Sequence, residues 1–253
     1  MDRLRVIELL QTAKPDGFVR AYRSIDSTNN EAKRILAGED GERVIIAESQ
    51  TGGRGRASNT WHSPPGANLY FSLVLDLGNI EEKDAGLLSI VFGVALHGAI
   101  APLVSGKLSL KWPNDLYLEG KKLAGILSEV TAGPKGGKFV IAGMGVNVNT
   151  RQFPPGLRAS ATSLLIEEKK QFAREELLAA IVSRTAAAAA RFREHGFAPF
   201  PGEFRKRCSL WGRKVRVDGR RGMMKDISAG GGLVLELDDG STEEIFSGSV
   251  ELI

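Results

Sequence analysis

The sequence is poor in the side chains that build disulfides and transition-metal sites. Its 253 residues include one cysteine, Cys208, and three scattered histidines, His62, His97 and His195. A single cysteine rules out an internal disulfide and a thiolate cluster. The three separated histidines argue against a transition-metal site as well.

Long apolar runs are also missing. The longest candidate, residues 87–104, is interrupted by serine, glycine, histidine and proline, and so lacks the ~20 apolar residues that span a bilayer. The first eleven residues contain no apolar core of a secretory signal. Hydrophobic residues make up 42% of the chain and charged residues 25%, an ordinary globular balance. We therefore expect a cytoplasmic protein that does not bind membranes.

Neither sign of charge is in large excess, since the formal net charge is +4. Such a balance permits nucleic-acid contact but does not require it, and is more typical of one or two basic clefts for anionic ligands. About twenty residues precede the first motif, which is too short for the usual three helices of a helix-turn-helix domain. We expect no DNA partner.

Helical and strand-like segments alternate through the first two hundred residues. Apolar spacing and capping signals predict helices over 4–13, 28–38, 84–104 and 174–196. Thr28 is the predicted N-cap of the second helix, with Glu31 completing a capping box. Strands are predicted over 43–48, 68–75, 108–112, 115–130 (a hairpin around Glu119–Gly120) and 138–149.

The texture changes near Trp211. Short alternating strands, separated by glycine and aspartate turns, follow at 214–217, 232–240, 242–246 and 250–253. So few residues form a marginal unit alone, so we predict a small β-barrel docked on the main domain. The predicted boundary separates a main domain, 1–207, from the barrel, 208–253.

The stretch QTGGRGR, followed by Trp61, joins flexible backbone to two arginines. Glycines let backbone N–H groups approach an anion, and guanidinium groups bind phosphate through a planar fork. An indole can stack on a base or cover an apolar ligand. The stretch matches neither a Walker A loop nor a GxGxxG dinucleotide fingerprint. Taken alone, it could also be a solvated surface loop.

Three further motifs carry polar groups at predicted element ends. KWPND, 111–115, puts a cation, an amide and a carboxylate where Pro113 breaks a strand, although a plain type I turn explains it equally well. Lys122 borders the apolar stretch LAGIL and could simply be an edge lysine. The two glycines of GMGVNVN, 143–149, indicate close backbone approach or a bulge. STN, 27–29, is a helix N-terminus able to bind a polar ligand.

The order and spacing of these motifs resemble the biotin protein ligases. STN, QTxGRGR with a tryptophan, KWPND, KLAGIL and GxGxNxN occur in this order over about residues 20–150. The resemblance implies an α+β fold, with a mixed sheet flanked by helices and a small C-terminal SH3-like β-barrel. The chain resembles the catalytic-only members, which lack the N-terminal DNA-binding domain of larger relatives.

The resemblance also implies site residues. Biotin would contact Ser27, Thr28, Asn29, Gln50, Gly53, Arg54, Gly55, Arg56, Lys122 and Gly125. ATP would contact Arg56, Trp61, Lys111, Asn114, Asp115 and Asn147, and Asp115 is a candidate Mg²⁺ ligand. The cations with catalytic roles would be Arg54, Arg56, Lys111 and Lys122.

The implied reaction joins biotin to AMP and then passes the biotinyl group to a lysine of a biotin carboxyl carrier protein domain. Two anions must meet, so their repulsion has to be cancelled by the cations and Mg²⁺. Because the biotin carboxylate is itself the nucleophile, no Ser-His-Asp triad is needed. We expect the stretch 52–61 to act as a mobile lid that keeps water from the mixed anhydride. A homodimer is compatible with the family.

One departure from the family pattern falls in this loop. The pattern usually continues GRGRxGRxW, whereas Ser58 and Asn59 occupy the further glycine and arginine positions here. We expect retained activity with a weaker hold on the adenylate. Two alternatives stay open: a lipoate or octanoate ligase of the same fold, and a non-catalytic, biotin-responsive regulator that binds nucleic acid.

Overall fold

The computed structural model describes residues 18–253 except 40, 57, 58, 77, 79 and 81. The helix predicted over 4–13 lies outside these residues. Among the helices described, none combines the length and apolar character needed to cross a membrane.

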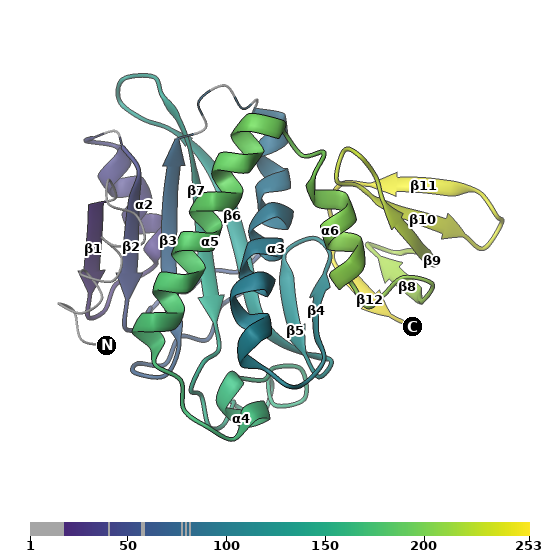
Figure 1. The fold of residues 1–253 in the computed structure, drawn as a ribbon, viewed down its shortest axis with the longest axis horizontal. Coiled ribbons are helices and arrows are strands. Elements are labelled where there is room, and N and C mark those ends of the chain that lie inside the picture. Colours follow the sequence, from purple (N-terminus) through teal and green to yellow (C-terminus); the bar gives the residue numbers. More distant parts are fainter. Residues whose placement is uncertain (1–17, 40, 57–58, 77, 79, 81) are drawn as a thin grey trace.

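A seven-stranded mixed sheet forms the body of the protein (Figure 1), in the order β1-β2-β3-β7-β6-β5-β4. β1 and β2 are parallel, and every other neighbouring pair is antiparallel. The strands are β1 (Phe18–Tyr22), β2 (Arg43–Ala47), β3 (Leu69–Asp76), β4 (Leu108–Lys111), β5 (Asp115–Leu118), β6 (Lys121–Ala132) and β7 (Lys138–Val146).

Helices cover the two faces of the sheet unequally (Figure 1). On one face, α3 (Leu88–Ile100) and α5 (Arg174–His195) lie side by side and bury a large apolar core. On the other face, α2 (Thr28–Leu36) covers only part of β2, β3 and β7 and buries a smaller cluster. The remaining area of this second face is the place where a ligand cavity can form.

Period-two alternation along the strands explains this division. Val140 and Ala142 of β7 belong to the large core, whereas Phe139 and Ile141 belong to the cluster under α2. Successive side chains of a strand point to opposite faces, so the two clusters lie on opposite sides of one sheet. Ser72 is a fully buried polar residue on β3, and its hydroxyl contacts Thr28 and Asn29 at the start of α2.

The C-terminal residues form a five-stranded antiparallel sheet of the small-barrel type, in the order β11-β10-β9-β8-β12. Its strands are β8 (Lys214–Val217), β9 (Arg220–Ile227), β10 (Leu233–Leu237), β11 (Thr242–Ile245) and β12 (Val250–Leu252). The predicted fold class, a mixed sheet flanked by helices with a small C-terminal barrel, is thereby confirmed.

The barrel docks on the body through a buried contact. The indole N–H of Trp112 donates to the backbone oxygen of Gly231 over 3.0 Å. Gly231 has φ +79°, and a Cβ there would lie 2.3 Å from a Leu87 methyl carbon, so a larger residue would be strained and would displace Leu87. One continuous apolar core runs through both parts. The boundary at 207/208 stays a prediction.

Several predicted elements are confirmed and a few details are wrong. The long helix predicted over 84–104 is three pieces: a 3₁₀ turn η1 (Glu82–Leu87), α3 and a 3₁₀ turn η2 (Ala101–Leu103) that contains a proline. The strand predicted to end at residue 149 ends at Val146. The sequence patterns did not predict β1, β9, α4 (Leu164–Glu168) or α6 (Phe200–Arg207).

The predicted capping box of α2 does not form. Ser27 is the N-cap and Thr28 is the first helical residue. The side-chain oxygen of Gln50 accepts from the Thr28 backbone N–H over 2.9 Å, and Glu31 instead accepts from the Tyr22 hydroxyl over 2.7 Å. A residue distant in sequence thus supplies the cap, which places Gln50 beside the helix N-terminus.

A half-buried histidine on α3, His97, makes the free energy of unfolding depend on pH. Burial and the charge of Arg207 lower the pKa of His97, against a smaller opposing effect of the Leu108 backbone, and His97 Nδ1 is buried without a hydrogen-bond partner. The unfolded chain therefore binds a proton more readily at this residue than the folded protein does. The contribution of His97 to the free energy of unfolding is therefore full above about pH 6.5 and is lost as the pH falls below that value.

We expect thermal unfolding of the wild-type protein to shift to lower temperature between pH 7.5 and pH 5.5, and the shift to be smaller in His97→Gln. The exposed His195→Gln is the matched control and should keep the wild-type shift. Equal acid shifts in the wild type and His97→Gln would contradict the assignment. Calorimetric Tm values at the two pH values provide the measurement.

Candidate active site

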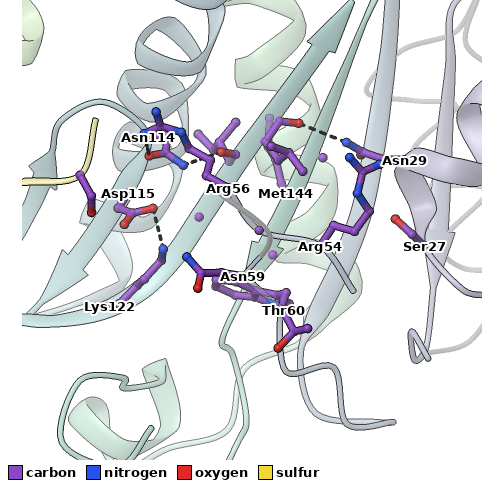
Figure 2. Close-up of a pocket in the computed structure, with 18 of the residues that line it drawn as sticks. Ser27, Asn29, Arg54, Arg56, Asn59, Thr60, Asn114, Asp115, Lys122 and Met144 are labelled. Carbon is purple, nitrogen blue, oxygen red and sulfur yellow. Dashed lines mark hydrogen bonds and ion pairs between the residues drawn. The ribbon is translucent and has the colours of Figure 1, made fainter. Parts of the chain in front are cut away.

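A cavity of about 400 Å³ opens on the sheet face that α2 leaves uncovered. Its floor is β6 and β7, and its walls are the N-terminus of α2, the loop around residues 50–61, the start of β5 and a turn of the barrel. Figure 2 shows side chains from these segments converging on the cavity. The volume lies in the range of small-ligand pockets, roughly 300–1,000 Å³.

Two glycines on the floor make room for an indole. Gly125 of β6 and Gly145 of β7 are direct cross-strand partners. A Cβ on Gly145 would lie 2.3 Å from Trp61 Cε2, and one on Gly125 would lie 3.2 Å from Trp61 Cζ3. Trp61 therefore rests on bare backbone, and its buried Nε1 has no hydrogen-bond partner.

A third glycine makes room for an amide. A Cβ on Gly143 of β7 would lie 2.2 Å from Asn29 Oδ1, so any larger residue there would displace the Asn29 amide. The close backbone approach predicted for the glycines of GMGVNVN is thus confirmed, with Asn29 and Trp61 as the approaching groups.

One end of the cavity is lined by buried, uncharged hydrogen-bonding groups. Thr28 and Asn29 are 4% and 3% exposed, and both contact the Ser72 hydroxyl, at 2.7 Å from Thr28 Oγ1 and 2.6 Å from Asn29 Oδ1. Gln50 Oε1 accepts from Thr28, and its Nε2 donates to Ser63 over 3.1 Å. Fixed donors and acceptors of this kind suit a neutral polar ring.

Arg54 lines the same end but is already paired. Its Nη2 lies 2.8 Å from Glu129 Oε1, and its Nη1 donates to Asn30 over 2.9 Å. Burial raises the pKa of Glu129, but hydrogen bonds from Lys33, Asn29 and Arg54 outweigh burial and leave that pKa below its usual range. The carboxylate is therefore ionised at neutral pH.

Arg56 meets only neutral acceptors in the structure. Its Nη1 donates to Asn114 Oδ1 over 3.3 Å and to the Gly248 backbone oxygen over 3.1 Å. Asn114 is held in turn, because its Nδ2 donates to the Ile126 oxygen over 2.7 Å. The guanidinium charge at this end of the cavity therefore has no carboxylate partner among the described residues.

Lys122 and Asp115 form an ion pair on the cavity wall, with 2.7 Å between Lys122 Nζ and Asp115 Oδ1. Lys122 Nζ also lies 5.6 Å from the centre of the Trp61 ring. An ammonium has three N–H donors, so the pair with Asp115 leaves donors for an anionic ligand. Figure 2 shows Lys122, Asp115, Asn114 and Arg56 together on one side of the cavity.

The described residues hold no group of three or more histidine, cysteine or acidic side chains close enough to bind a metal ion by themselves. Asp115 offers a single carboxylate on the cavity wall. Mg²⁺ is commonly held by one or two carboxylates together with substrate phosphates, so Asp115 fits a metal that arrives with a nucleotide. Its role as a ligand stays a prediction.

The predicted site residues are largely brought together. All except three line the cavity: Ser27, Thr28, Asn29, Gln50, Arg54, Gly55, Arg56, Trp61, Asn114, Asp115, Lys122 and Gly125. The exceptions are Gly53, Lys111 and Asn147. Gly53 lines a small adjoining recess instead.

Lys111 and Asn147 lie outside the cavity. Lys111 Nζ lies 3.2 Å from the Tyr117 hydroxyl and 4.9 Å from the centre of its ring, and burial lowers the pKa of Lys111. Asn147 is 4% exposed, and its backbone N–H donates to the Leu123 oxygen over 2.9 Å. Both are packed against protein groups. Their predicted nucleotide roles stay predictions.

Sequence reasoning missed part of the lining. The barrel contributes Asp218 and the turn 247–249, and the body contributes Thr60, Ile126, Leu127 and Met144. The barrel residues carried no sequence signal, because only the docking of the barrel brings them to the cavity. Ser72 and Glu129 were also missed, and each acts behind the lining by holding residues that reach it.

The stretch 52–61, called the lid loop after its predicted role, forms a tight hairpin in its described part. Gly55 N–H donates to the Asn59 oxygen over 2.7 Å, and Trp61 N–H to the Gly53 oxygen over 2.9 Å. Asn59, at the position where the family pattern carries arginine, lines the cavity. Ser58, the other departure, lies outside the described residues. The closing motion of the loop stays a prediction.

Comparison with known proteins supports the family suggested by the motifs. Residues 21–149 match the model of the biotin/lipoate A/B protein ligase family. The chain is 32% identical over 240 residues to the bifunctional ligase/repressor BirA of Escherichia coli, covering 93% of this chain and 74% of that protein. It is 33% identical over 226 residues to the biotin–[acetyl-CoA-carboxylase] ligase of Mycobacterium tuberculosis, covering 86% and 82%.

Solved structures agree with this result. The biotin protein ligase of Aquifex aeolicus, solved in complex with biotin and ATP, superposes with a TM-score of 0.81 at 30% identity. The match covers 93% of this chain and 98% of that one. From the fold, the site and these relatives together, the chain belongs to the biotin/lipoate A/B protein ligase family.

Proposed function

We propose that the protein is an ATP-dependent biotin ligase that forms biotinyl-5′-AMP and transfers the biotinyl group to a lysine of a biotin carboxyl carrier protein domain. One observation carries the proposal. A single cavity holds neutral polar groups at one end, the buried Thr28 and Asn29 and the half-buried Gln50, and at the other end the positive charge of Arg56, which meets neutral acceptors. Biotin has the matching polarity, with a neutral ureido ring and an anionic tail.

The first step joins two anions. A carboxylate oxygen of biotin attacks the α-phosphorus of ATP, an O–P bond forms, and the bond to pyrophosphate breaks. Arg56 would stabilise the phosphate charge, because its present acceptors are neutral and can be exchanged for an anion. Lys122 would hold the biotin carboxylate with the donors that Asp115 leaves free.

The second step transfers the acyl group. A neutral lysine amine of the carrier attacks the acyl carbon of biotinyl-5′-AMP, an amide bond forms, AMP leaves, and the amine proton is lost. The mixed anhydride must be kept from water until the lysine arrives. The hairpin of the lid loop over the cavity, with Trp61 on the glycine floor, would provide that exclusion.

Mg²⁺ would neutralise charge on the triphosphate and orient it for attack. Asp115 is the residue of this chain that would share it with the phosphates. A cytoplasmic location and a homodimer stay predictions.

The proposal predicts ATP–pyrophosphate exchange that depends on biotin. We expect purified protein with ATP and labelled pyrophosphate to exchange with biotin but not with lipoate or without an acid. Exchange with lipoate alone would keep the ligase family and overturn the substrate. Absence of exchange with either acid would contradict adenylate formation.

Arg56→Gln should weaken the hold on the adenylate. Charge-assisted hydrogen bonds contribute ~1.5–3 kcal/mol each, so we expect the dissociation rate of biotinyl-5′-AMP to rise roughly ten- to a hundredfold. Rapid dilution of the preformed complex measures that rate. Arg213→Gln, an exposed arginine outside the cavity, is the matched control. An unchanged rate in Arg56→Gln would remove Arg56 from the phosphate site.

Gly145→Ala should displace Trp61, because the added Cβ would lie 2.3 Å from the indole. A displacement of about 1 Å at a reacting site can cost roughly a hundredfold in rate. We expect the KM for ATP in biotin-dependent exchange to rise and the intrinsic fluorescence, to which Trp61 contributes together with Trp112 and Trp211, to change. Gly202→Ala on α6 meets no atom within 4 Å and is the control. An unchanged KM for ATP would show that Trp61 does not take part in nucleotide binding.

A further inference from the structure

Glu129, on β6, connects the lid loop to helix α2. Its Oε2 accepts from Asn29 Nδ2 over 2.8 Å, and its Oε1 accepts from Lys33 over 2.7 Å and from Arg54 Nη2 over 2.8 Å. The side chain is 18% exposed. One ionised carboxylate therefore receives donors from two residues of the helix and one of the loop.

Glu129 lies behind the cavity and is not part of its lining. Two of the groups that it holds, Asn29 and Arg54, do line the cavity. The carboxylate therefore reaches the cavity through contacts with these two neighbours.

The contacts with Glu129 fix the orientation of the Arg54 guanidinium. Both of its Nη atoms are engaged, because Nη1 lies 3.3 Å from Glu129 Oε2 and 2.9 Å from Asn30 Oδ1 while Nη2 contacts Glu129 Oε1. Figure 2 shows Arg54 pointing toward Asn29, away from Asp115 and Lys122. The guanidinium of Arg54 thus faces the protein, whereas that of Arg56, two residues later, lies on the side of the cavity that holds Asn114.

We propose that Glu129 is a positioning residue for biotin binding. Through Arg54 it anchors the base of the lid loop to β6, and through Asn29 it fixes the amide at the polar end of the cavity. The guanidinium of Arg54 then acts as a loop anchor and not as a direct ligand of the substrate anions. This proposal rests on the proposed function for its effect on biotin, and on geometry alone for its effect on the loop.

The anchor acts before chemistry begins. Holding a loop in its binding conformation lowers the ordering cost that a ligand must otherwise supply. Loss of the anchor should therefore raise the KM for biotin more than it lowers kcat. Charge-assisted hydrogen bonds of this strength correspond to roughly a tenfold effect or more.

The test variant is Glu129→Gln, which keeps the shape and removes the charge. Glu31→Gln is the matched control, because Glu31 is 17% exposed, accepts from Tyr22 and Arg34, and makes no hydrogen bond to the described part of the lid loop. In biotin-dependent exchange we expect a roughly tenfold higher KM for biotin with kcat within about threefold for Glu129→Gln, and wild-type values for Glu31→Gln. Equal KM values in all three proteins would overturn the proposal.

A second readout needs no enzymatic activity. Trypsin cleaves after arginine, and the anchored loop contains Arg54 and Arg56. We expect ligand-free Glu129→Gln to be cut in this loop at least several-fold faster than the wild type or Glu31→Gln, as mapped by mass spectrometry. Equal cleavage rates would overturn the anchor even if the wild type ligates biotin.

Arg54→Lys is a second variant that tests the same contact if Glu129→Gln does not fold. It keeps the charge and the trypsin site but loses the two-point contact with Glu129. We expect faster loop cleavage in this variant, and a double variant with Glu129→Gln no worse than Glu129→Gln alone. Additive effects would contradict action through one contact. If the wild type shows no ATP–pyrophosphate exchange but the variants still differ from it in loop cleavage, the proposed function is rejected and the role of Glu129 as a loop anchor is kept.

Discussion

The cavity depends on the antiparallel register of β6 with β7. That register puts Gly125 beside Gly145, and the neighbouring strands continue the row with Asp115 on one side and Tyr70 on the other. Because residues in register share a face of the sheet, the row has two bare positions at its centre and polar side chains at its ends. A slip of β6 by one residue would turn Gly125 to the covered face, and the floor under Trp61 would lose one of its two bare positions.

Successive rows of cross-strand partners on the same face have different roles: some line the cavity and others pack under α2. One step along the strands, Gly143 lies between Ser72 and Leu127, and Asn29 occupies the space that this glycine leaves. One step further, Ile141 pairs with Glu129 under the edge of α2. The face thus passes from an open floor to a polar wall and then to apolar packing.

The cations of the site differ in how far their charge is already compensated. Arg54 and Lys122 each face a carboxylate, whereas Arg56 is held by an amide and a backbone oxygen of the barrel. The barrel is therefore part of the site as well as part of the core, since its turn contributes lining residues and an acceptor for Arg56. Its position is secured by the buried contact between Trp112 and Gly231.

Local patterns in the sequence were enough to predict most helices and strands, the C-terminal barrel and the family motifs that gather at the cavity. They could do so because periodicity, turn residues and short motifs are properties of neighbouring residues. Gln50 as the cap of α2, Glu129 as the partner of Arg54, and the barrel turn as a wall join residues far apart in the chain. Lys111 and Asn147, in contrast, belong to the motifs but lie outside the cavity. The sequence by itself determined which chemical groups are present and in what order. Only the tertiary structure decided which of them share a cavity and which carry uncompensated charge, because both depend on strand register and on the docking of the barrel.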